Sequence, residues 1–276
     1  MRENKISRTL KIYIPLGLLM VFILFPYIWT FITSIKPATE LYTADFQFLP
    51  VEPTWFNYVQ VLSEKKFILG ARNSIIVAVS TSVVTLIIAL MAAYACSRYK
   101  FKGKKYVLVG FLLIYMFPPV LLLMPLFVVM KNLMLLNTFT SLVVAYCTFS
   151  IPFAIWLLTG FMNDIPVELE EAGIVDGCNR FNAFVRIIFP VMAPGVVAAL
   201  IYIFIYSWNE FIFANMFTVT NTKTIPIIIY SFIGENNIDW GLLTSGGILT
   251  GLPIIIMFMF IQKNLVRGLT SGGIKG

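Results

Sequence analysis

The stretch Ile165–Pro190, IPVELEEAGIVDGCNRFNAFVRIIFP, is an amphipathic, charged segment between two strongly apolar ones. Pro166 suits the first turn of a helix, because its missing N–H would be unpaired there, and glutamates favour the positive end of the helix dipole. Glu168 and Glu171 are three residues apart and should share an outward face. Gly177 is expected to end this helix before a second one begins. The stretch, called the bracket below, predicts a helix–turn–helix with an acidic face for a partner, and an ordinary solvated loop is the alternative.

The composition indicates an integral membrane protein. The 276 residues are 59% hydrophobic and 12% charged, whereas soluble domains carry roughly 25% charged residues. The net charge of +7 does not indicate nucleic-acid binding, because the basic residues gather at the ends of apolar runs, as topology determinants do. Histidine is absent, which removes the commonest general base and metal ligand. The three cysteines show no metal-binding spacing.

Apolar runs long enough to cross a bilayer predict an all-α protein with six transmembrane helices. The expected spans cover about residues 12–35, 73–95, 106–130, 141–161, 191–213 and 240–260. We take residues 1–276 as a single transmembrane domain, with a coupling loop at 162–190 between spans 4 and 5. The prolines at 118, 119 and 125 fall inside the third span, where they indicate either a kink or a part that lines a cavity.

The distribution of basic residues predicts the topology. With the N-terminus inside, the inner segments hold 14 of the 20 Lys and Arg residues and the outer segments hold 6. An excess of Lys and Arg marks the cytoplasmic side. Both termini and the bracket are therefore expected in the cytoplasm, with residues 36–69 and 215–239 outside.

At the bracket the sequence resembles the permeases of ABC importers, which share the signature Glu-Ala-Ala, three residues, Gly, nine residues, Ile, one residue, Leu-Pro. Glu171-Ala172-Gly173, then Gly177, and Ile187 to Pro190 match this spacing throughout, with Gly173 replacing the second Ala and Phe189 replacing Leu. Gly173 should loosen the helix by roughly 1 kcal/mol relative to Ala. SWNEF at 207–211 and the ending RGLTSGGIKG at 267–276 are similar to the carbohydrate-uptake subfamily, especially to the second permease of maltose and multiple-sugar transporters.

This resemblance implies one permease subunit of an ATP-driven sugar importer in a bacterial inner membrane. The bracket would dock into a separate cytoplasmic ABC ATPase, which holds ATP and Mg. Glu171 would pair with that ATPase, Ala172 and Gly173 would permit close approach, and Asp176 is expected to cap the second helix. The expected coupling residues are Glu168, Glu171, Ala172, Gly173, Asp176, Gly177 and Pro190. A second homologous permease and an extracytoplasmic sugar-binding protein are the further partners, besides membrane lipid.

The sequence predicts no catalytic residues, no metal site and no cofactor of its own. It lacks the phosphate-binding loop G-x-x-x-x-G-K-[ST] and any His-bearing triad. Sugars bind to aromatic faces and hydroxyl-pairing side chains, so the substrate pathway is expected at Tyr146, Thr148, Ser150, Tyr202, Tyr206, Asn209 and Glu210. Plain packing is the alternative, because Trp and Tyr gather at membrane interfaces and Ser and Thr bond within their own helices. Glu210, expected near the outer interface, requires a partner or water.

Two other functions remain open at this stage. A permease of the same superfamily would move a non-sugar solute, such as an organophosphate or a polyol. A stand-alone secondary transporter would show ionisable residues at mid-membrane and an inverted repeat, and the centres of the predicted spans carry no Asp, Glu, Lys or Arg.

Overall fold

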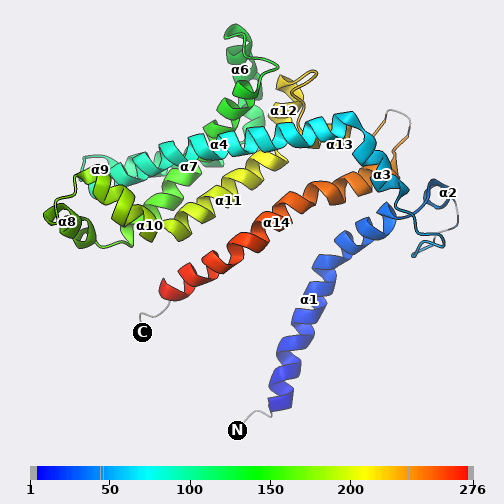
Figure 1. Cartoon of the computed structure of the whole chain (residues 1–276), viewed down its shortest axis with the longest axis horizontal. Coiled ribbons are helices and arrows are strands. Elements are labelled where there is room, and N and C mark those ends of the chain that lie inside the picture. Colours follow the sequence, from blue (N-terminus) through cyan, green and yellow to red (C-terminus); the bar gives the residue numbers. More distant parts are fainter. Residues whose placement is uncertain (1–4, 44, 46, 235–236, 273–276) are drawn as a thin grey trace. The chain divides into compact units, whose positions relative to one another are not determined.

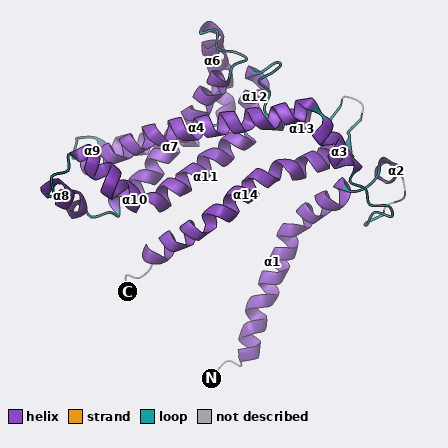
Figure 2. Cartoon of the chain, in the orientation of Figure 1, coloured by secondary structure: helices purple, strands orange, loops and turns teal. Residues whose placement is uncertain are grey.

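The computed structural model describes residues 5–43, 45, 47–234 and 237–272, which form helices joined by turns and no extended strand (Figure 2). Arg2 and Lys275, two of the basic residues counted for the predicted topology, lie outside the described residues. The helices run in the order α1 (Lys5–Ser34), α2 (Ala38–Leu41), α3 (Phe56–Ser63), α4 (Lys65–Arg98), α5 (Lys104–Met116), α6 (Pro119–Asn132), α7 (Phe139–Asn163), α8 (Val167–Val175), α9 (Arg180–Ala183), the π-helical turn η1 (Phe184–Ile188), α10 (Phe189–Val191), α11 (Ala193–Asn209), α12 (Ile212–Phe217), α13 (Ile225–Tyr230) and α14 (Trp240–Gly272).

The chain divides into two compact units, residues 1–68 with 229–252, and residues 69–228 with 253–276. In the first unit, Asn57 of α3 is buried and donates through Nδ2 to the carbonyl oxygens of Ser34 and Lys36, each at 2.9 Å. These bonds fix α3 against the end of α1. The second unit holds the bracket and all of the candidate site residues.

Four helical segments are long and apolar enough to cross a membrane by themselves: Lys11–Ser34, Lys65–Arg98, Phe139–Asn163 and Trp240–Phe260. They contain the predicted spans 12–35 (to one residue), 73–95, 141–161 and 240–260. Two bent helix pairs raise the number to as many as six among the described residues. The orientation of the termini stays a prediction.

The predicted third span, 106–130, is interrupted at Pro118 and Pro119, as its prolines indicated. α5 and α6 meet at a bend of 92°, and the backbone at Phe117 and Pro118 is extended, with ψ of 131° and 122°. Each of these residues precedes a proline, and the proline ring excludes the helical conformation of the residue before it. The pair Pro118-Pro119 therefore ends one helix and starts another.

The predicted fifth span, 191–213, does not lie within a single helix. The helical stretch Arg180–Val191 meets α11 at 77°, and α11 ends at Asn209. Glu210 is extended, with ψ of 127°, and α12 begins two residues later. The predicted span joined the last turns of one helix, all of α11 and the start of a third helix.

The core of the second unit lies where α4, α7 and α11 run alongside one another (Figure 1). Ala89 and Ala93 of α4, Ala154 of α7 and Ala199 of α11 are fully buried there, and such small side chains let helix backbones approach closely. A second cluster forms around Tyr146 and joins α6, α7 and α12.

Asn137 ties the turn between α6 and α7 to the segment after α12. Its φ of 60° lies in the left-handed region, which Asn tolerates better than most residues. Its Oδ1 accepts from the Thr222 hydroxyl at 2.6 Å and from the Val219 N–H at 3.1 Å. Its own N–H donates to the Phe217 carbonyl oxygen at 2.8 Å.

Replacing Asn137 with Ala is expected to destabilise the detergent-purified protein by about 1–3 kcal/mol, since it removes these side-chain bonds and leaves a residue poorly suited to positive φ. Asn137→Gly keeps the backbone conformation and removes only the bonds, so its effect should be smaller. Thermal unfolding measures both variants. Equal stability of the wild-type protein, Asn137→Ala and Asn137→Gly would show that the Asn137 hydrogen bonds do not stabilise the fold.

Candidate functional site

The bracket is a helix–turn–helix, as predicted. α8 ends at Val175, and Gly177 has a φ of 92°. The Gly177 N–H donates to the Ile174 carbonyl oxygen and the Cys178 N–H to that of Gly173, both at 3.0 Å. This pair of bonds is the Schellman motif, which closes a helix with a left-handed residue at its C-terminus. Gly177 is therefore required by the backbone conformation of the turn.

The predicted N-cap at Asp176 is wrong. Asp176 is the C-cap of α8, and Asn179 is the N-cap of α9, where its side chain accepts from the Asn182 N–H at 2.8 Å. The Schellman turn uses Gly177 and Cys178 before the second helix begins, which places Asp176 too early in the chain to cap it.

The acidic residues of α8 fall on different faces. Glu168, Glu171 and Ala172 are exposed, as is Asp176 beyond the helix. Glu170 is buried, with 4% of its surface exposed. The shared outward face of Glu168 and Glu171 is confirmed, and the bracket presents it at one end of the second unit (Figure 1). Pro190, within α10, is exposed as well.

Gly173 serves close packing inside this chain. It is buried, and a Cβ at this position would lie 2.2 Å from Cδ1 of Ile187 in η1. The absence of a side chain lets the two arms of the bracket touch, which gives a physical reason for Gly in place of the second Ala of the signature. Its predicted role in approach to an ATPase remains a prediction.

Glu170 was missed by the sequence analysis. Its Oε2 accepts from Nε of Arg98, the last residue of α4, at 3.1 Å, and both side chains are 6% exposed. Its Oε1 accepts from the Tyr94 hydroxyl. Arg98 is one of the inner basic residues of the predicted topology. The available signal was the helical period, which places Glu170 on the same side of α8 as Gly173.

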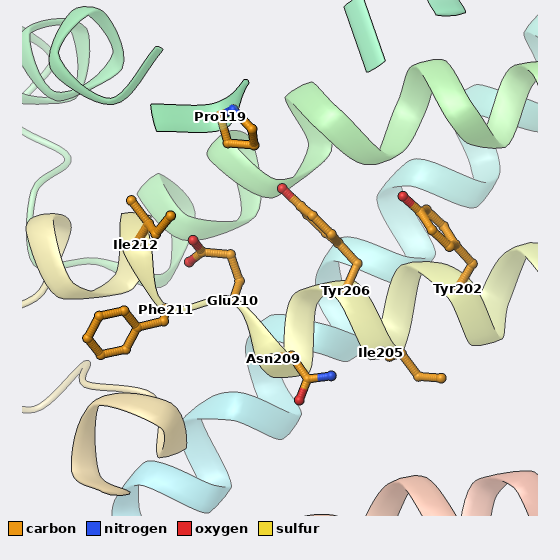
Figure 3. A pocket seen from close by; sticks show the side chains of 8 residues that line it. All are labelled: Pro119, Tyr202, Ile205, Tyr206, Asn209, Glu210, Phe211 and Ile212. Carbon is orange, nitrogen blue, oxygen red and sulfur yellow. The ribbon is translucent and has the colours of Figure 1, made fainter. Parts of the chain in front are cut away.

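Four predicted substrate residues come together at a cavity of about 490 Å³ in the second unit (Figure 3). Its lining consists of Pro119, Tyr202, Ile205, Tyr206, Asn209, Glu210, Phe211 and Ile212. Tyr202, Tyr206 and Glu210 project from one side of the chain toward Pro119, whereas Asn209 leaves α11 on the other side (Figure 3).

The other predicted substrate residues do not line this cavity. Tyr146 and Ser150 are fully buried, although the Tyr146 ring lies 6.4 Å from that of Tyr206. Thr148 donates from its hydroxyl to the Val144 carbonyl oxygen at 3.0 Å. This bond within α7 is the alternative that the sequence analysis left open.

Glu210 finds its partners in the backbone. Its two carboxylate oxygens accept from the N–H groups of Phe213 at 2.9 Å and Ala214 at 3.1 Å. The carboxylate therefore caps the first turn of α12, where the helix dipole favours negative charge. The partner that an acid at this position requires lies within the chain itself.

A row of aromatic rings from α5, α7 and α11 leads to the cavity. Ring centroids are 5.0 Å apart for Tyr115 and Phe153, 4.1 Å for Phe153 and Tyr202, and 6.4 Å for Tyr202 and Tyr206, the last pair stacked at 17°. Tyr115 and Phe153 were not predicted, since their proximity depends on contacts between separate helices. Such faces suit the apolar surfaces of a sugar ring, and among the described residues no cluster of His, Cys, Asp and Glu suits a metal ion.

The described residues form an all-helical fold with four to six candidate membrane spans. The family described as binding-protein-dependent transport system inner membrane component matches residues 85–271. The chain belongs to this family and is a transport subunit of the inner membrane.

Curated relatives cover nearly the whole chain. The sulfoquinovosyl glycerol transport system permease protein SmoH of Agrobacterium fabrum is 36% identical over 265 residues, which is 96% of this chain and 93% of the relative. The trehalose transport system permease protein SugB of Mycobacterium tuberculosis is 36% identical over 94% of this chain and 95% of its own. A chain of a bacterial ABC transporter for alginate import superposes with a TM-score of 0.79 at 22% identity, over 95% of this chain and 98% of that one.

Replacing Gly177 with Val should destabilise the bracket by about 1–3 kcal/mol, since a β-branched residue resists positive φ. A Cβ there meets no atom within 4 Å, so the effect comes from the backbone alone. Gly177→Asn, which tolerates this conformation, is the matched control. Thermal unfolding and limited proteolysis of the bracket check the difference, and equal behaviour of Val and Asn would contradict it.

Proposed function

We propose that this chain is one permease subunit of an ATP-driven importer for a sugar or oligosaccharide, and that the bracket couples it to a separate ATPase. The observation that carries the coupling is the exposed acidic face of α8, with Glu168 and Glu171, on a helix held rigidly by the Schellman turn at Gly177. A short rigid helix with outward charge suits a basic-edged groove on a soluble protein.

The partners follow from the same proposal. ATP and Mg bind to cytoplasmic ABC ATPase subunits, a second homologous permease completes the pathway, and an extracytoplasmic sugar-binding protein delivers the solute. A protein of the structural comparison is described as an alginate ABC transporter in complex with a substrate-bound periplasmic protein, which supports such a partner here. Six spans with both termini in the cytoplasm would place the bracket on the ATPase side.

The aromatic cavity supports the sugar part of the proposal. Tyr202 and Tyr206 line it and extend the ring row from Phe153. The relatives named above are permeases for sulfoquinovosyl glycerol and trehalose, both of which contain sugar rings. No Lys or Arg is among the residues that line the cavity, so they offer no cation to an organophosphate, the alternative solute.

Glu171→Lys is expected to prevent recovery of the ATPase with the tagged permease, because it places a positive charge against the proposed basic groove. Affinity purification in mild detergent and mass spectrometry measure the loss. Glu64→Lys, the same change at an exposed residue after α3, is the control that should retain the ATPase. Undiminished ATP-driven uptake with Glu171→Lys would exclude the coupling role.

Tyr206→Ala is expected to raise the KM for uptake of the sugar about tenfold, since the lost apolar contact with the solute costs roughly 1.5 kcal/mol and 1.4 kcal/mol corresponds to a factor of ten. Tyr206→Phe keeps the ring and should retain most of the affinity. Uptake assays in proteoliposomes, with the binding protein saturating, check the pair. A hydroxyl role is indicated instead if Phe and Ala are equally impaired, and no role in the pathway if neither is.

A further inference from the structure

We propose that Arg98, Glu170 and Tyr94 form a joint that transmits movement of the bracket to α4, and that Arg98 and Glu170 are positioning residues for transport. The inference rests on the proposed function, because the bracket must receive the movement from an ATPase. Nothing in the coupling signature includes these three side chains, since Glu171 and not Glu170 occupies its first position.

Arg98 contacts both ends of the connection between α7 and α8. Its Nε donates to Glu170 Oε2 at 3.1 Å, and its Nη1 reaches the carbonyl oxygen of Met162, near the end of α7, at 3.4 Å. The neighbouring Ser97 hydroxyl donates to Oδ1 of Asn163 at 2.8 Å. The last turn of α4 is thereby fastened to the end of α7 and to α8 at the same point.

The pair is removed from water, which makes it a strong constraint. Both side chains are 6% exposed, and Nη2 of Arg98 is buried with no hydrogen-bond partner among the described residues. Glu170 therefore supplies the carboxylate that balances the buried guanidinium. Separating the two would leave uncompensated charges in a low dielectric, so the pair resists separation and the two helices move together.

Tyr94 extends the joint to the second arm of the bracket. Its hydroxyl donates to Glu170 of α8, and its ring packs edge-on against Phe184 of η1 with centroids 5.4 Å apart. One turn further on, the ring of Tyr99 lies 5.8 Å from the guanidinium of Arg180 in α9. The last turn of α4 thus contacts α8 and η1, and the residue that follows it contacts α9.

α4 is suited to carry this movement through the unit. It is continuous over Lys65–Arg98 with no proline inside, and it meets the bracket directly through contacts between residues far apart in sequence, since Arg98 precedes Glu170 by 72 residues. Toward its other end, Asn73 Nδ2 donates to the carbonyl oxygens of Asn221 and Lys223 at 2.7 and 2.9 Å. A displacement of the bracket would therefore reach the segment that follows α12.

The test uses the complete complex of permeases, ATPase and binding protein in proteoliposomes, and measures solute taken up per ATP hydrolysed. Arg98→Gln and Glu170→Gln are expected to keep the ATPase bound while this ratio falls about 5- to 150-fold, the usual range of coupling between sites. The exchanged pair Arg98→Glu with Glu170→Arg should restore part of the ratio, which a loss of folding alone would not explain.

Tyr94→Phe and Arg98→Lys are milder variants that keep the ring and the charge, for use if the neutral variants fail to assemble. Each should lower the ratio about fivefold without lowering recovery of the complex. A wild-type ratio of uptake to ATP hydrolysis in both milder variants, or in the neutral variants where these assemble, would contradict the proposed joint. Arg98 and Glu170 would then serve folding only.

Glu171→Lys, run alongside, separates this inference from the proposed function. If Glu171→Lys loses the ATPase while Arg98 and Glu170 variants transport normally, the docking surface stands and the joint is wrong. If Glu171→Lys keeps both the ATPase and ATP-driven uptake, the proposed docking of the bracket into the ATPase is wrong. A lowered ratio in the Arg98 and Glu170 variants would then locate coupling at α4 by another surface.

Discussion

The arrangement of the bracket depends on the burial of one ion pair. Arg98 and Glu170 lie at the end of α4 and in the first turns of α8, and charges taken out of water are tolerated only when they are paired and hydrogen-bonded. This requirement fixes the rotation of α8 about its axis. Once Glu170 faces inward, the helical period turns Glu168 and Glu171 outward, so the exposed acidic face follows from an interaction on the opposite side of the helix.

The backbone imposes the second constraint. Pro118 and Pro119 force a bend of 92° between α5 and α6, and the extended residue Glu210 separates α11 from α12. Interrupted helices in a membrane protein are tolerated where protein or a cavity surrounds the freed polar groups. Pro119 and Glu210 both line the 490 Å³ cavity, and the Glu210 carboxylate satisfies two of the N–H groups exposed by the break.

Local patterns of the sequence predicted the features that depend on neighbouring residues. The four long apolar helices, the turn at Gly177 and the outward face of Glu168 and Glu171 each follow from spacing within one segment. The sequence did not reveal that Glu170 pairs with Arg98, or that the ring of Phe153 packs against that of Tyr202, because residues of separate helices meet there. The predicted N-cap was Asp176, whereas the structure has it at Asn179. The length of the Schellman turn decides where the next helix begins, and the sequence did not reveal that length.

The two acidic sites of the second unit differ in what they offer to another molecule. Both oxygens of Glu210 accept hydrogen bonds from backbone N–H groups, so this carboxylate is engaged within the chain as the cap of α12. The residues that remain available around it are chiefly aromatic and aliphatic. Glu168 and Glu171, in contrast, are exposed and free to meet a charged surface. Charge thus gathers where a protein partner would dock, and ring faces gather where a neutral, sugar-like solute would pass.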